Sequence, residues 1–326
     1  MKILITGGLG FIGSNFTRRF SLLGYNLVVI DKITYASDLS QIDFYNESKI
    51  EFQKSDVSDI SDLREIFKSY GEFDIVVNFA AESHVDRSIT DPKNFVYSNV
   101  IGVYNLLTLQ REGLINKFIQ ISTDEVYGSI AINEKSERWT ESTKIDPQNP
   151  YSATKASAEL MCNAFRNTYD SDIIITRSSN NFGPFQSVDK LIPKIIFHAV
   201  NNRKIPIYGK GSQIREWIHV EDHCKAIENI IINKPCVNLY NLGGTSSTNL
   251  NLTKKILELM DKNEELIEFV KDRAGHDFQY SLNSELYEQE FNHNLDENFV
   301  DKLEKTVLWY LNNYSWMEQS YMRIIK

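Results

Sequence analysis

The sequence KILITGGLGFIG at residues 2–13 begins with an apolar run of strand length and continues into a turn with glycines at positions 7, 10 and 13. Residues 11–23 then carry apolar side chains at helical spacing. A strand, a glycine-rich turn and a helix in this order favour dinucleotide binding, because the glycines let backbone N–H groups approach a pyrophosphate at the helix N-terminus. The predicted contacts come from Gly7, Gly10, Phe11, Ile12 and Gly13.

An acidic residue follows this turn at the distance expected for a ribose contact. Asp31 ends the second apolar run, about 20 residues beyond the turn, where a carboxylate holds the adenosine ribose hydroxyls. The same charge repels a 2′-phosphate, so the sequence predicts NAD as cofactor rather than NADP. Asp56 and Val57 end the third run and are expected beside the adenine, and Ala80 and Ala81 end the fourth, near the nicotinamide.

The first half of the chain alternates apolar runs with amphipathic stretches, which is typical of a parallel sheet covered by helices. Strands are predicted at 2–6, 26–31, 51–54, 74–80, 117–122 and 172–177, and helices at 11–23, 58–70, 92–112 and 151–169. After residue 178 the pattern becomes irregular and rich in Gly, Pro and Asn. We therefore expect an α/β protein with a Rossmann-type, doubly wound parallel sheet in residues 1–178 and a smaller mixed α+β substrate-binding lobe in 179–326. Segments near 217–243 are expected to return to the first domain.

Composition excludes several classes of protein. The 326 residues contain 44 acidic and 35 basic ones, a net charge of −9, which disfavours binding to nucleic acid or to an anionic membrane. Three widely spaced cysteines and the lack of a long apolar segment predict a cytoplasmic protein without a disulfide framework. His219 and His223 have the spacing of metal ligands on a helix but lack a third ligand, so no metal is expected.

Residues 151–155, YSATK, begin the fourth predicted helix and place a tyrosine and a lysine one turn apart. A tyrosine with its ordinary pKa near 10 is a poor base at neutral pH. A lysine ammonium nearby stabilises the phenolate, so the sequence predicts that Lys155 lowers the pKa of Tyr151 and that Tyr151 acts as a catalytic base.

With these features the chain resembles the extended short-chain dehydrogenase/reductase family over essentially its whole length. Sugar-nucleotide epimerases of that family lack an acidic pair after the fifth strand, whereas STDEVYG at 122–128 contains Asp124 and Glu125 and resembles the nucleotide-sugar 4,6-dehydratases. Further segments resemble the same family, namely AAESHVDRSI (80–89), SSNNFGPFQ (178–186), KLIPK (190–194), PIYGKGSQIREWIHVEDH (206–223) and DRAGHD (272–277).

The resemblance implies a reaction and a role for each catalytic residue. Tyr151, with Lys155, takes the proton of the sugar 4-hydroxyl while Thr123 hydrogen-bonds that oxygen and a hydride passes to NAD. Glu125 then removes the carbon 5 proton, and Asp124 protonates the departing 6-hydroxyl. Return of the hydride to carbon 6 and of a proton to carbon 5 leaves a 4-keto-6-deoxy sugar. Two adjacent acids suit this elimination because close like charges and burial drive their pKa values apart.

The resemblance also assigns ligand contacts. Further cofactor contacts are implied for Lys32, Thr34, Ser83, Ser98, Tyr151, Lys155 and Asn180. Substrate contacts are implied for His84, Thr123, Asn181, Lys190, Leu191, Ile207, Tyr208, Arg215, Asn249, Arg273 and His276. Ala274 departs from the family, which commonly has proline there.

Several alternatives remain open from the sequence. The substrate is a nucleotide-diphosphate sugar, either dTDP-glucose or UDP-glucose. A non-catalytic NAD-binding regulator with the same fold is a second class, which the intact catalytic residues disfavour. The resemblance implies a homodimer formed through the helices at 92–112 and 151–169, where Val96, Val100, Tyr104 and Leu107 are suitable apolar positions.

Overall fold

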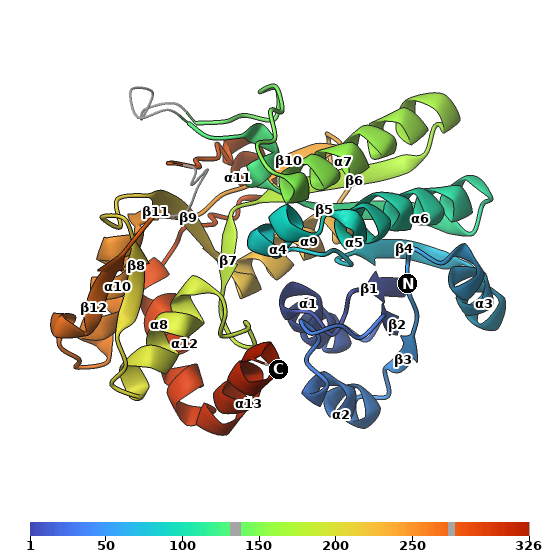
Figure 1. Ribbon diagram of the computed structural model, residues 1–326. Helices are drawn as coiled ribbons and strands as arrows, with labels where there is room; N and C mark the ends of the chain where they lie inside the picture. The colour runs from blue at the N-terminus through green and yellow to red at the C-terminus, as the bar shows by residue number, and fades with distance from the viewer. Residues whose placement is uncertain (131–137, 273–277, 326) are drawn as a thin grey trace. The chain divides into compact units, whose positions relative to one another are not determined.

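The computed structural model describes residues 1–130, 138–272 and 278–325 (Figure 1). The chain forms two compact units, each built from separate stretches of sequence. Unit 1 comprises Met1–Gly128, Glu141–Ser178 and Ile227–Asn241, and unit 2 comprises Ser129–Thr140, Ser179–Ala226 and Leu242–Lys326. The predicted assignment of the cofactor to residues 1–178 and of the sugar nucleotide to 179–326 stays a prediction.

A seven-stranded sheet forms the centre of unit 1. Its strands are β1 (Lys2–Thr6), β2 (Asn26–Asp31), β3 (Glu51–Lys54), β4 (Phe73–Asn78), β5 (Ile115–Thr123), β6 (Asp172–Ser178) and β10 (Leu239–Leu242). The order is β10-β6-β5-β4-β1-β2-β3, and the pairings from β3 to β6 are parallel. This is the Rossmann order, with a topological switch point between β1 and β4 where ligands bind at the carboxyl ends of the strands. The predicted fold class is confirmed.

Helices cover the sheet because the strands alternate buried side chains toward its two faces. The helices are α1 (Phe11–Ser21), α2 (Ser40–Glu47), α3 (Ile60–Tyr70), α4 (Val85–Thr90), α5 (Lys93–Val96), α6 (Gly102–Arg111), α7 (Pro150–Tyr169) and α9 (Val220–Ile232), with a 3-10 turn η2 (Asp124–Tyr127). Figure 1 shows α6 and α7 side by side along the sheet. Side chains of α3, α6 and α7 pack with those of β1, β2 and β4–β6 into one apolar core.

The stretch predicted as one helix at 92–112 is interrupted. Between α5 and α6 lies a π-helical turn, η1 (Tyr97–Ile101), which inserts one residue into the helical repeat. The two consecutive residues Ser98 and Asn99 are both buried there. Asn99 donates to Thr154 Oγ1 on α7 at 3.0 Å, and Ser98 lines the pocket described below.

Unit 2 has mixed α+β structure. Its strands β7 (Asn180–Phe182), β9 (Ile214–His219) and β11 (Thr245–Thr248) form one sheet, and β8 (Ile205–Tyr208) pairs with β12 (Ile267–Val270). Its helices are α8 (Leu191–Val200), α10 (Asn249–Leu259), α11 (Glu285–Phe291), α12 (Phe299–Asn312) and α13 (Tyr314–Ile325), with a 3-10 turn η4 (Glu264–Leu266). Apolar side chains of α8, α10, α12 and the short strands form its core. In the ranges that the structure describes, no helix has the length and apolarity needed to span a membrane.

Candidate active site

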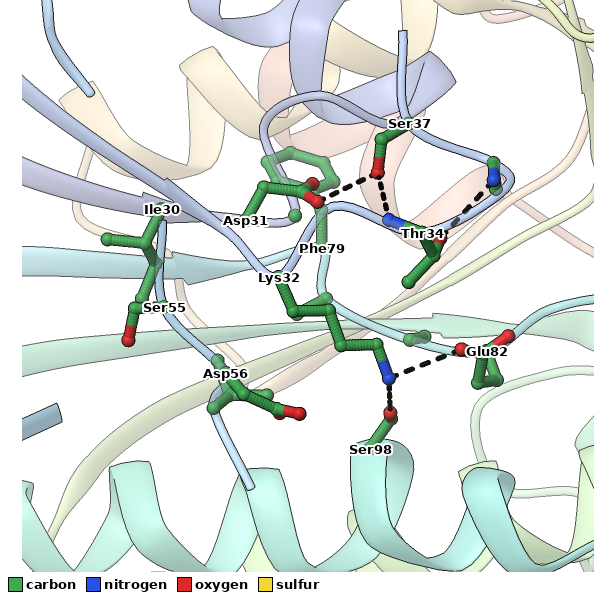
Figure 2. A pocket seen from close by; sticks show the side chains of 16 residues that line it. Ile30, Asp31, Lys32, Thr34, Ser37, Ser55, Asp56, Phe79, Glu82 and Ser98 are labelled. Carbon is green, nitrogen blue, oxygen red and sulfur yellow. Dashed lines mark hydrogen bonds and ion pairs between the residues drawn. The ribbon is translucent and has the colours of Figure 1, made fainter. Parts of the chain in front are cut away.

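A pocket of about 530 Å³, open to solvent, lies in unit 1 at the carboxyl ends of β1, β2 and β4 (Figure 2). Ten residues predicted to contact the cofactor line it: Gly7, Gly10, Asp31, Lys32, Thr34, Asp56, Val57, Ala80, Ala81 and Ser98. Six residues that the sequence analysis did not predict also line it: Ile30, Ala36, Ser37, Ser55, Phe79 and Glu82.

The glycine-rich turn brings backbone close to backbone. Gly7 has φ +67°, and a Cβ atom there would lie 2.7 Å from the backbone nitrogen of Ala80. A Cβ atom on Gly13 would lie 2.4 Å from the Gly7 carbonyl oxygen, so both positions require glycine. Helix α1 begins at Phe11, its N-cap Gly10 makes no side-chain cap hydrogen bond, and the positive end of the helix dipole favours an anion there.

Asp31 is held firmly at the edge of this pocket. Its carboxylate accepts hydrogen bonds from Leu9 N at 3.1 Å, Ile33 N at 2.8 Å and Ser37 Oγ at 2.9 Å. Burial raises the pKa of Asp31, and these hydrogen bonds together with the charge of Lys32 oppose that rise. A carboxylate offers about four acceptor positions, so about one remains for a ligand hydroxyl.

Charged and polar groups close the opposite wall. Lys32 Nζ lies 3.2 Å from Glu82 Oε1 and donates to Ser98 Oγ at 2.6 Å, as Figure 2 shows. The backbone N–H of Glu82 donates to Asn99 Oδ1 at 2.8 Å. The π-helical turn thus fixes both the loop after β4 and the ammonium of Lys32.

The five predicted catalytic residues come from two segments of unit 1. Thr123 ends β5, and its hydroxyl accepts from Glu125 N at 3.3 Å and donates to Asp124 Oδ1 at 3.1 Å. Tyr151 on α7 lies near enough to Thr123, Glu125 and Asp124 for all three to affect its pKa. The structure therefore brings the acidic pair, the threonine and the tyrosine together, with Lys155 one turn further along α7.

The electrostatics of Tyr151 differ from the sequence-based expectation. The pKa of Tyr151 is raised, first by burial and then by the charges of Glu125 and Asp124, while the hydrogen bond with Thr123 opposes the rise. Lys155 donates to the Ile121 carbonyl at 2.5 Å, and burial lowers its own pKa to about 8. The phenol is therefore held neutral by its surroundings, because burial outweighs the stabilisation expected from the lysine.

A buried ion pair lies one turn beyond Lys155. Glu159 accepts from Arg177 on β6, with the Nη2 to Oε2 distance at 2.5 Å, and from Ser122 Oγ at 2.5 Å. The side chains of Glu159 and Arg177 are 1% and 6% exposed. The charge of Glu159 raises the pKa of Lys155 and so opposes the effect of burial.

The remaining predicted ligand residues are distributed over both units. In unit 1, Phe11, Ile12 and Gly13 form the first turn of α1, and Ser83 and His84 lie between β4 and α4, outside the pocket lining. Unit 2 contains Asn180 and Asn181 on β7, Lys190 and Leu191 at the start of α8, Ile207 and Tyr208 on β8, Arg215 on β9, and Asn249 at the start of α10. Arg273 and His276 lie outside the described residues.

Three of these unit 2 side chains have well-defined surroundings. Asn181 Oδ1 lies 2.8 Å from Nδ1 of His223, a buried histidine whose pKa burial lowers to about 3. Arg215 donates to the carbonyl oxygens of Ile214 and Phe278. Ile207 is 2% exposed and packs in the apolar core, so its side chain is not accessible to a ligand.

A parallel sheet in Rossmann order, a dinucleotide-type turn and a buried tyrosine and lysine on one helix define an enzyme of the extended short-chain dehydrogenase/reductase class. The family model described as GDP-mannose 4,6 dehydratase matches residues 4–306, and the chain belongs to this family.

Individual relatives are similar over almost the whole chain. The dTDP-glucose 4,6-dehydratase of Salmonella typhimurium is 40% identical, with 97% of this chain and 94% of the relative covered. The low-salt glycan biosynthesis protein Agl12 of Haloferax volcanii is 42% identical, with 96% and 99% covered. Among solved structures, this chain is similar to DesIV, a dTDP-glucose 4,6-dehydratase from Streptomyces venezuelae crystallised with NAD bound. The two are 36% identical with a TM-score of 0.92, and the match covers 98% of this chain and 100% of the DesIV chain.

Proposed function

We propose that the protein is an NAD-dependent hydro-lyase that converts dTDP-glucose to dTDP-4-keto-6-deoxyglucose and water. The observation that carries this proposal is the adjacent acidic pair, Asp124 and Glu125, which is hydrogen-bonded to Thr123 and lies near Tyr151 within one unit. Among the protein side chains that transfer protons, an oxidation at carbon 4 alone would need only Tyr151 and Lys155. The acidic pair supplies the base and the acid that an elimination requires in addition.

The pocket residues fit NAD. The N–H groups at the start of α1 suit a pyrophosphate, and the one remaining acceptor position of Asp31 suits a ribose hydroxyl. When bound, NAD would supply the hydride acceptor for oxidation at carbon 4 and, once reduced, the hydride donor for carbon 6. The negative charge of Asp31 disfavours the 2′-phosphate of NADP.

The protein side chains move the protons of the reaction. Tyr151 takes the proton of the 4-hydroxyl as a phenolate, a form that the Lys155 ammonium and, when NAD is bound, the positive nicotinamide ring would favour over the neutral phenol, and Thr123 hydrogen-bonds the same oxygen. The 4-ketone acidifies the hydrogen on carbon 5, which Glu125 removes while Asp124 protonates the leaving 6-hydroxyl, and a proton returns to carbon 5 when the hydride reaches carbon 6. Asp124 is 2% exposed and Glu125 is half-buried, so the two carboxyl groups have different environments, as opposite protonation states require.

The sugar nucleotide is proposed to contact His84 in unit 1 and, in unit 2, Asn181, Lys190, Leu191, Ile207, Tyr208, Arg215, Asn249, Arg273 and His276. The base is proposed to be thymine, on the strength of full-length similarity to dTDP-glucose 4,6-dehydratases. Uracil is the alternative, since the two bases differ by one methyl group.

A homodimer and a cytoplasmic location belong to the same proposal. Exposed apolar side chains on α5, α6 and α7 support the dimer, among them Val96, Tyr104 and Leu160 at 44%, 45% and 58% exposure. Leu107, which the sequence also suggested for this surface, is buried within the subunit. The three cysteines form no disulfide in the described part of the chain, which is consistent with a reducing compartment.

A turnover assay with dTDP-glucose and UDP-glucose tests the function directly. The expected result is a 4-keto-6-deoxy product, formed faster from dTDP-glucose, without added NAD being consumed. Glu125→Gln and Asp124→Asn should still oxidise the sugar but accumulate bound NADH, with the later steps slowed about 10² to 10⁴-fold. Absence of product from either nucleotide sugar would refute the dehydratase and favour the regulator, and normal product formation by both variants would refute the acid–base pair.

A further inference from the structure

One side chain connects the acidic pair to the start of the helix that carries Tyr151. Asn149 is the N-cap of α7, and its Oδ1 accepts from Ser152 N at 2.9 Å. Its Nδ2 donates to Glu125 Oε2 at 3.3 Å. Asn149 N in turn donates to the Ser152 hydroxyl at 3.2 Å, which completes a reciprocal capping box.

From this contact we propose that Asn149 is a positioning residue that holds the carboxylate of Glu125 in place relative to Tyr151 for the removal of the carbon 5 proton. This inference rests on the proposed function, because it concerns the elimination step. Asn149 is neither the acid nor the base of any proposed step. It acts through Glu125 on one side and through the first turn of α7 on the other.

The chemistry of the amide explains why asparagine suits this position. Serine, threonine and aspartate cap helices equally well, because each has an oxygen that accepts from the first-turn N–H groups. An asparagine side chain also has an NH₂ group that can donate to an ionised carboxylate at the same time. The backbone N–H of Glu125 is already bound to Thr123 Oγ1, so the Asn149 contact fixes the far end of the side chain.

Two kinds of substitution separate the two contacts of Asn149. Asn149→Ser keeps a capping oxygen and removes the donor to Glu125. Asn149→Asp keeps the cap and places a second carboxylate against Glu125. Ser152→Ala is the matched control, because it weakens the capping box without changing the contact to Glu125.

Rapid mixing with dTDP-glucose measures each step. Absorbance of reduced nicotinamide reports the oxidation, and deuterium incorporation at carbon 5 from heavy water reports the proton removal. For Asn149→Ser we expect normal formation of bound NADH and a 10- to 100-fold slower carbon 5 exchange, so that NADH accumulates. Asn149→Asp should be slower still. In Ser152→Ala, disturbance of the helix start should slow the formation of NADH instead, because Tyr151 serves the first step.

Coupling provides a second test. If Asn149 acts through Glu125, then Asn149→Ser should add little to the defect of Glu125→Gln in the double variant. Carbon 5 exchange at the wild-type rate in both Asn149 variants overturns the inference while leaving the proposed function intact. A slow first step in Asn149→Ser that matches Ser152→Ala also overturns it, since capping alone would then explain the effect. Wild-type protein that forms no product overturns the inference together with the proposed function.

Discussion

Replacement of Glu159 by glutamine tests whether the buried ion pair behind Lys155 controls both the stability of unit 1 and the charge of the lysine. Glu159→Gln keeps the shape of the side chain but removes the negative charge opposite Arg177. In Glu159, Oε1 accepts from Ser122 and Arg177, and Oε2 accepts from Arg177. Glutamine has only one acceptor oxygen and cannot make all of these bonds. The variant therefore leaves a buried guanidinium without a counter-charge.

The size of the effect follows from burial. Both side chains are at most 6% exposed, and removal of one partner from a buried pair costs about 3–5 kcal/mol of stability. Hydrogen exchange of α7 and β6 amides by mass spectrometry measures this loss locally. We expect those amides to exchange at least about 10²-fold faster where they exchange through cooperative opening. Glu112→Gln, which breaks the exposed pair with Arg64, is the control and should have a much smaller effect.

A second readout is catalytic. Since the charge of Glu159 raises the pKa of Lys155, its removal should lower that pKa below its present value of about 8. The basic limb of the pH profile for NADH formation should then move to lower pH. Unchanged exchange in α7 and β6 would contradict the stability argument. An unmoved basic limb would show that Lys155 does not sense Glu159.

Other predictions concern single groups. Tyr151→Phe should abolish hydride transfer while NAD binding stays nearly unchanged, because only the hydroxyl is lost; calorimetric titration with NAD and a stopped-flow trace check the two parts. The wild-type protein should bind NAD at least about tenfold more tightly than NADP at moderate salt, because repulsion between Asp31 and a 2′-phosphate is worth more than about 1.4 kcal/mol; equal affinities would contradict this. Burial lowers the pKa of Lys155 from 10.5 to about 8, so the folded chain binds fewer protons than the unfolded chain between these pH values. Lys155 should therefore make the free energy of unfolding increase as pH rises through that window. In Lys155→Met, the increase in the urea concentration at the unfolding midpoint between pH 8 and pH 10 should be smaller than in the wild-type protein.

The sequence predicted best those elements whose pattern is set by burial. The bounds predicted for β1 and β2, which are mostly buried apolar runs, agree with the structure, and so do those of β3, although its side chains are mostly exposed. Helix α2 was missed because its sequence, SQIDFYNE, is short and mostly polar. The π-helical turn was missed as well, because one inserted residue does not visibly disturb helical spacing over so short a stretch.

Within the candidate site, the sequence indicated residue types and the structure added their partners. The turn glycines and Asp31 were predictable from fixed spacing. Ser37 and Glu82 were not, because they reach the pocket through loop geometry that no periodicity encodes. The neutral state of Tyr151 was also unpredictable, since it depends on how deeply α7 buries the phenol and on the nearby Glu125.

The order in which the strands of unit 1 leave the ribosome has a consequence for biosynthesis. The sheet is not finished when β6 has been made, because its edge strand β10 is separated from β6 by residues 179–238, of which 179–226 belong to unit 2. Until residues 239–242 have been synthesised, β6 is an unpaired edge that can join another chain. A nascent or truncated chain ending between β6 and β10 is therefore the form of this protein most exposed to aggregation. Transplanting unit 1 into another protein would require three separate segments, the last of which supplies the closing strand.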